Sequence, residues 1–132
     1  MTRTEAREQA FMVLFEKIFN SESTISEIIA EAQDSELIKI NGFAERILIA
    51  VEENIEAIDN IITENAQGWT LTRLPRVTLA ILRLAVCEIK YLDEVPAGVA
   101  VNEAVELAKK YGTNDDAGYI NGILGTITRA SV

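Results

Sequence analysis

Few side chains in this sequence could carry out a reaction. The chain of 132 residues contains no histidine, which is the commonest general base and metal ligand. Its single cysteine, Cys87, falls within an apolar stretch, and we interpret it as a core residue rather than a nucleophile. The sequence has no phosphate loop of the G-x-x-x-x-G-K-[ST] or G-x-G-x-x-G type. We therefore predict that the protein is not an enzyme and that it needs no metal and no cofactor.

The segment 111-YGTNDDAGYINGILG-125 has residue types suited to binding. At about 100° per residue, one face of a helix carries four apolar residues: Ile120, Ile123, Leu124 and Ile127. The opposite face carries only glycines, each of which costs a helix about 1 kcal/mol relative to Ala: Gly118, Gly122 and Gly125. The segment is a helix of poor propensity, or another helix of the domain approaches this face closely, or a partner or nucleotide meets its bare backbone. In the last case Tyr119, on the flank, offers a plane for stacking.

The N-terminal segment carries two arginines that could form a small cationic patch. Arg3 and Arg7 lie one helical turn apart, just beyond the end of an apolar stripe that begins at Phe11. We expect them to reach off the edge of the domain together. Because Glu5 and Glu8 lie nearby, two ordinary surface arginines are the alternative.

Five or more helical segments are predicted to position these residues. The first runs from about Thr2 to Asn20 and opens with a capping box, Thr2-x-x-Glu5. A second capping box, Thr24-x-x-Glu27, opens a short helix. After a turn at 41–42, a long helix is expected to continue to about Asn65, with a bend at Asn54 and a stop at 67–68.

The second half of the chain predicts three more helices. Residues 77–92 are apolar on nearly every side, which indicates a buried central helix with Pro75 in its first turn. A turn at 96–98 leads to another helix that Gly112 stops, and Thr113 or Asn114 can cap the last one. No strand pattern of comparable length competes. The predicted fold class is all-α, a compact helical bundle in one domain spanning residues 1–132.

The overall charge restricts the class of partner. The formal net charge is −9, which favours solubility and argues against non-specific binding of nucleic acid. No run of about 18 uncharged apolar residues is present, and the N-terminus lacks the apolar core of a signal peptide. We expect a cytoplasmic protein that does not enter the membrane.

Four blocks of the sequence resemble the NusB family of bacterial transcription antitermination factors. They are 6-AREQAFMVLF-15, 80-AILRLAVCEIKY-91, 95-VPAGVAVNEAVELAKKYG-112 and 119-YINGIL-124. The resemblance implies an all-α fold of two small helical subdomains without catalysis. It also implies binding of the boxA sequence of nascent RNA together with NusE, a small-subunit ribosomal protein. This assembly then joins the RNA polymerase antitermination complex and supports transcription of ribosomal RNA.

The resemblance also implies which residues of this chain contact those partners. The RNA-binding positions of the family match Arg3, Arg7, Asp115 and Tyr119. Thr78 stands where the family has an acidic contact to NusE. The chain departs from the family pattern in its N-terminal arginine run, which Thr4 and Glu5 interrupt, and before Tyr119, where a glycine replaces a basic residue.

Other functions and assemblies remain open from the sequence. The acidic charge also fits a helical protein-interaction module with no RNA binding of its own. A NusB-like domain detached from an RNA methyltransferase is a third hypothesis, although the expected single domain argues against it. A homodimer is also possible, and the preferred RNA sequence is not predicted.

Overall fold

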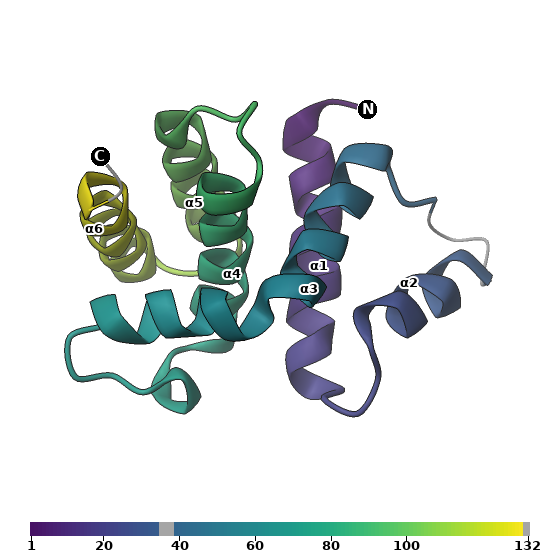
Figure 1. Cartoon of the computed structure of the whole chain (residues 1–132), viewed down its shortest axis with the longest axis horizontal. Coiled ribbons are helices and arrows are strands. Elements are labelled where there is room, and N and C mark those ends of the chain that lie inside the picture. The colour runs from purple at the N-terminus through teal and green to yellow at the C-terminus, as the bar shows by residue number, and fades with distance from the viewer. Residues whose placement is uncertain (35–38, 131–132) are drawn as a thin grey trace.

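The structure, a computed structural model, describes residues 1–34 and 39–130, and all the regular secondary structure in these ranges is helical. The elements in chain order are α1 (Arg3–Phe19), α2 (Ile25–Asp34), α3 (Gly42–Asn65), the 3-10 helix η1 (Leu71–Arg73), α4 (Arg76–Tyr91), α5 (Ala97–Tyr111) and α6 (Asn114–Ala130). Figure 1 shows α1 and α2 on one side of the molecule and α4, α5 and α6 on the other. The predicted all-α class is confirmed. None of the described helices is long and apolar enough to cross a membrane.

Both predicted capping boxes form. The Oγ1 atom of Thr2 accepts from the N–H of Glu5 at 3.1 Å, and the Glu5 carboxylate accepts from the N–H of Thr2 at 3.0 Å. Thr24 and Glu27 exchange the same two bonds before α2, at 3.0 and 3.3 Å. These local bonds satisfy N–H groups that a helix start otherwise leaves unpaired, so the starts of α1 and α2 follow from the sequence.

The predicted bend in the long third helix is also present. Asn54 has a non-helical backbone (φ −124°, ψ 19°), and its side-chain amide donates to the carbonyl of Ala50 at 2.8 Å. Beyond this bend, the second half of α3 extends along the bottom of the view in Figure 1, under α4 and toward the side of α6. The bend therefore lets one helix pack against α1, α2, α4 and α6.

Helix α4 is the central helix, as predicted. Ten of its 16 residues are buried, and it packs against α1, α3, α5 and α6. Two details at helix starts differ from the prediction. Pro75 precedes the first residue of α4 instead of lying within its first turn, and α5 begins at Ala97, so Gly98 belongs to the helix and not to the turn. A proline directly before a helix supplies no N–H, and none is needed there.

Helix α6 is capped by Thr113, whose Oγ1 atom accepts from the N–H of Asp116 at 3.1 Å. Its predicted core face is confirmed, since all four of the apolar residues on that face are buried. The interpretation that another helix of the domain approaches the glycine face is wrong for Gly118 and Gly122. A Cβ atom built at either position meets no atom within 4 Å, so neither glycine is required by packing inside the protein.

Candidate nucleic-acid interface

A hollow of about 210 Å³ lies between the start of α4 and the start of α6. Its lining residues are Trp69, Leu74, Pro75, Thr78, Asp115, Asp116 and Tyr119. We call it the α4–α6 hollow. It brings together Thr78, Asp115 and Tyr119, three of the five residues predicted to contact partners. It also includes Trp69, which is not among the residues predicted to contact partners.

Trp69 is held at the edge of the α4–α6 hollow by the turn that ends α3. Gln67 and Gly68 both have positive φ, at 44° and 90°, and the N–H of Trp69 then donates to the carbonyl of Ala66 at 3.2 Å. The side chain remains 51% exposed. A large aromatic residue with half its surface in solvent is an efficient platform for a base. The signal in the sequence was the only tryptophan of the chain directly after a helix stop.

Tyr119 reaches the same turn from α6. Its ring is half-buried, and its hydroxyl donates to the carbonyl of Ala66 over a long 3.4 Å. Burial raises the pKa of Tyr119, so the phenol stays neutral at physiological pH. Trp69 and Tyr119 are thus both tethered to the carbonyl of Ala66, one through its backbone and one through its side chain.

The two carboxylates of the α4–α6 hollow differ in their bonding. Asp116 completes the cap of α6 by accepting from the N–H of Thr113 at 2.9 Å. Asp115 is exposed and has no hydrogen-bond or ion-pair partner among the residues that the structure describes. Asp115 is therefore the carboxylate that is free to accept from a ligand.

Thr78 lies at the base of the α4–α6 hollow. Its side chain is fully buried, and its Oγ1 atom has no hydrogen-bond partner. The expected contact between Thr78 and a protein partner needs an exposed side chain, and in this structure Thr78 presents none. An unsatisfied buried hydroxyl costs about 1–3 kcal/mol, so its presence needs an explanation.

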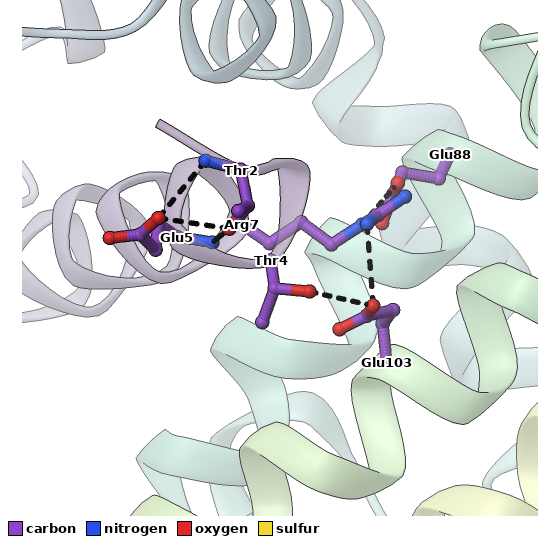
Figure 2. Close-up of polar contacts among 6 residues, drawn as sticks. All are labelled: Thr2, Thr4, Glu5, Arg7, Glu88 and Glu103. Carbon is purple, nitrogen blue, oxygen red and sulfur yellow. Dashed lines mark hydrogen bonds and ion pairs between the residues drawn. The ribbon is translucent and has the colours of Figure 1, made fainter.

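The two predicted arginines lie away from the α4–α6 hollow, near the other end of α4. The expectation that Arg7 reaches off the domain edge is wrong, because its side chain is only 3% exposed. Its Nε atom donates to Glu88 of α4 at 2.8 Å, and its Nη1 atom lies 3.7 Å from Glu103 of α5 (Figure 2). Thr4 adds a hydrogen bond to Glu103 at 2.9 Å (Figure 2). Arg7 therefore joins α1 to α4 and α5.

Burial dominates the electrostatics of this buried cluster of Arg7, Glu88 and Glu103. Burial raises the pKa of Glu88, and the guanidinium of Arg7 opposes that rise without cancelling it. A buried carboxylate that lost Arg7 would face the whole desolvation penalty. In this structure the guanidinium of Arg7 is therefore buried and paired with a carboxylate, so it is not available to a phosphate.

Arg3 remains at the surface, as predicted. Its guanidinium lies 4.4 Å from the ring centroid of Phe43, at the start of α3, a cation–π contact that leaves the side chain exposed. Thr78 and Glu88 are ten positions apart on α4, which corresponds to about 15 Å along the helix. The predicted RNA-binding residues therefore form two separate groups rather than one patch.

Comparison with known proteins identifies the family. Residues 4–129 match the NusB family. A transcription antitermination protein NusB of Natranaerobius thermophilus is 40% identical over 132 residues, covering 96% of this chain and 94% of that protein. The chain belongs to the NusB family.

Solved structures agree with the fold. The chain is similar to T. maritima NusB with a TM-score of 0.86 and 31% identity, covering 98% of this chain and 92% of that one. It is also similar to a chain from a crystal structure of the antitermination factors NusB and NusE in complex with dsRNA. That match has a TM-score of 0.84 and 29% identity, and it covers 98% of this chain and 99% of the other.

Proposed function

We propose that the protein is an RNA-binding transcription antitermination factor that acts together with NusE. The observation that carries this proposal is the α4–α6 hollow, where Trp69 and Tyr119 border a cavity in a chain of the NusB family. The crystal structure of a similar NusB with NusE and dsRNA supports both partners. By the family resemblance, the RNA is a boxA sequence and the assembly joins RNA polymerase during transcription of ribosomal RNA.

The α4–α6 hollow supports recognition by stacking. We propose that Trp69 and Tyr119 each stack on a base, a contact that contributes about 1–3 kcal/mol and tolerates any base type. Asp115, at the start of α6, is placed to accept from the N–H groups of a base edge. We propose that Arg3 contacts RNA backbone beyond the hollow, whereas Arg7 contributes only by holding α1 in place.

The charge of the chain explains why NusE is needed. The net charge is −9, and three of the arginines, Arg7, Arg46 and Arg83, are paired with carboxylates inside the protein. Few cations remain to neutralise phosphates, so we expect weak RNA binding by the protein alone. NusE should raise RNA affinity by at least about tenfold, a coupling of roughly 1.4 kcal/mol.

A titration of boxA RNA with and without NusE tests the proposal. Salt-dependent binding that NusE strengthens supports it. Equal affinity in both titrations would contradict the coupling with NusE. NusE binding without any RNA binding would favour the alternative, an acidic helical module that binds only proteins.

The protein has no catalytic activity of its own and acts in the cytoplasm, the compartment of bacterial transcription. Residues 1–132 act as one domain. A homodimer is compatible with this function but not required by it.

A further inference from the structure

A cavity of about 390 Å³ lies where α1, α2, α3 and α4 meet, and it shares no lining residue with the α4–α6 hollow. We call it the four-helix cavity. Protein interiors are normally packed without voids much larger than a water molecule. Apolar cavities of this size are typical of small-molecule sites. Each of the four helices contributes apolar side chains to its walls: Leu14, Ile18, Ile25, Val51, Ile55 and Leu79.

Side-chain bonds to backbone carbonyls fix the walls of the four-helix cavity. The Nζ atom of Lys17 donates to the carbonyls of Ser21 and Ser23 at 2.7 and 2.6 Å, which holds the loop between α1 and α2. On α3, two of the apolar residues lie on either side of the bend that the bond from Asn54 to the Ala50 carbonyl stabilises. The cavity is therefore formed before any ligand arrives, so little conformational freedom is lost on binding.

Three charged residues also line the four-helix cavity, and they differ in how their charges are balanced. The guanidinium of Arg83 makes two hydrogen bonds to Asp59, at 2.9 and 3.0 Å, so its charge is neutralised within the protein. Lys17 and Glu52 are both half-buried, and neither forms an ion pair in the part of the chain that the structure describes. A half-buried charge without an opposite charge lowers stability, so these two groups favour a ligand that neutralises both.

Both groups keep hydrogen-bonding capacity for a ligand. The ammonium of Lys17 has three donors, of which the two carbonyls use two. The carboxylate of Glu52 accepts from the Oγ atom of Ser26 at 3.1 Å through its Oε2 atom, which leaves its Oε1 atom free. The cavity thus presents one cationic donor, one anionic acceptor and apolar walls.

We propose that the four-helix cavity binds a free α-amino acid with an apolar side chain. The α-carboxylate of the amino acid accepts from Lys17, and its α-ammonium donates to Glu52. The side chain lies against the apolar walls. The inference goes beyond the proposed function, since the site needs neither RNA nor NusE.

Other ligand classes match the four-helix cavity less well. A fatty acid would pair with Lys17 but leave Glu52 without a cation, and an apolar amine would do the reverse. The phosphate of a nucleotide would be repelled by Glu52. An apolar side chain within a protein partner would fill the walls but would bring neither charge. A zwitterion with an apolar side chain complements all three parts of the cavity.

The test is a calorimetric titration of the protein alone with L-leucine. Leucine should bind, and three analogues that each lack one part should bind at least about tenfold more weakly. Leucinamide lacks the carboxylate, 4-methylpentanoate lacks the ammonium, and glycine lacks the side chain. Thermal unfolding gives a second measurement. Leucine at about ten times its Kd favours the folded state about elevenfold, so it should raise the melting temperature.

Two variants assign the charged groups of the ligand to their partners. Glu52→Gln should weaken leucine binding about tenfold and leave 4-methylpentanoate binding unchanged, because that analogue has no ammonium. Lys17→Met should weaken leucine binding and leave leucinamide binding unchanged, which also shows that the cavity is intact in the variant. The matched control is Glu53→Gln, because Glu53 is adjacent in the chain but exposed and outside the cavity lining.

Three results would overturn the amino-acid site. The first is no binding of leucine at millimolar concentration. The second is equal affinity for leucine and its charge-deficient analogues, or tighter binding of uncharged N-acetylleucinamide, which would assign the cavity to an apolar side chain of a protein partner. The third is unchanged leucine binding in both Glu52→Gln and Lys17→Met. None of these results bears on the proposed function, because RNA and NusE are absent from the titration.

Discussion

The polar groups at the two ends of α4 differ in whether they have partners inside the protein. Near its last turn, Glu88 is buried and bonded to Arg7, which also lies near Glu103, so the charges there are compensated within the protein. Near its first turn, the Thr78 hydroxyl and three backbone N–H groups lack partners, and Trp69 is half in solvent. Polar groups that pair with each other inside the protein hold helices together. Buried polar groups without a partner reduce the stability of the fold unless a ligand or another molecule binds them. We therefore propose that the end of α4 near Glu88, the structural end, holds the fold together and that the end near Thr78, the binding end, contacts a partner.

The largest expected effect tests the structural end. Arg7→Ala should reduce the free energy of unfolding by about 3–5 kcal/mol, because it leaves Glu88 buried without its cation. Urea unfolding measures this loss. Arg46→Ala, which removes an exposed ion pair with Glu94, is the control and should cost much less. A loss in Arg7→Ala no greater than in this control would contradict the comparison.

The same variant predicts a pH dependence. Burial raises the pKa of Glu88 above its ordinary value of 4.5, so the folded state binds the proton more tightly than the unfolded state. The contribution of Glu88 to stability is therefore present at low pH and falls as the pH rises through the folded pKa. Without Arg7 that pKa rises further. The cost of Arg7→Ala should thus be largest at neutral pH and shrink as the pH approaches 4.5, which unfolding curves at several pH values can check.

The next largest effect tests the binding end. Tyr119→Ala should weaken RNA binding by about 1–3 kcal/mol, the range for losing one base stack, and Trp69→Ala should do the same. The salt slope should stay the same, since neither side chain neutralises a phosphate. Tyr91→Ala, at the last residue of α4, is a control because Tyr91 is an exposed aromatic residue at the other end of that helix.

Tyr119→Phe separates stacking from packing. It keeps the ring, which packs partly against the core, and removes only the hydroxyl with its long bond to Ala66. RNA binding should be nearly normal in this variant. If Tyr119→Ala melts at a much lower temperature while its folded fraction binds RNA normally, then Tyr119 is a core residue and the α6 side of the binding end is wrongly assigned.

A smaller effect concerns whether RNA extends to the structural end. Arg3→Ala should lower the salt slope by about one unit and weaken binding by about 1 kcal/mol if a phosphate reaches Arg3. Arg7→Ala should leave the slope unchanged wherever it remains folded, because its guanidinium is already paired. A slope change in Arg7→Ala and none in Arg3→Ala would reverse the roles given to these two arginines.

The smallest effect concerns the glycines of α6. Gly118→Ala and Gly122→Ala should each stabilise the protein by about 0.5–1 kcal/mol, because the added methyl group meets no atom and the unfolded chain loses freedom. Thermal unfolding measures this gain. A simultaneous loss of affinity for RNA or NusE would show that a partner contacts this bare backbone. Normal affinity would restrict the binding end to the α4–α6 hollow.

Features that depend on neighbouring residues were predictable from the sequence. Both capping boxes involve residues three positions apart, and the core face of α6 follows from helical spacing alone. The bend at Asn54 is also local, since the side chain bonds to a carbonyl four positions earlier. Such features need no knowledge of the tertiary fold.

Features that depend on distant residues were not predictable in the same way. The pairing of Arg7 with Glu88 joins residues 81 positions apart, and nothing near Arg7 indicates that α4 will cover it. Trp69 was overlooked because Gln67 and Gly68 were interpreted only as a helix stop, whereas their positive φ angles hold the indole beside Tyr119 and the start of α4. Thr78 could be named from the sequence, but its burial could not.

The position of Cys87 provides a natural reporter of conformational opening. The thiol is fully buried in α4, lies 3.6 Å from the carbonyl of Ile47 in α3, and burial raises its pKa to about 12. A thiol reagent therefore reacts only with molecules in which α3 and α4 have separated. Since the chain has no other cysteine, the rate of labelling reports the frequency of that one opening event, with no engineered probe required.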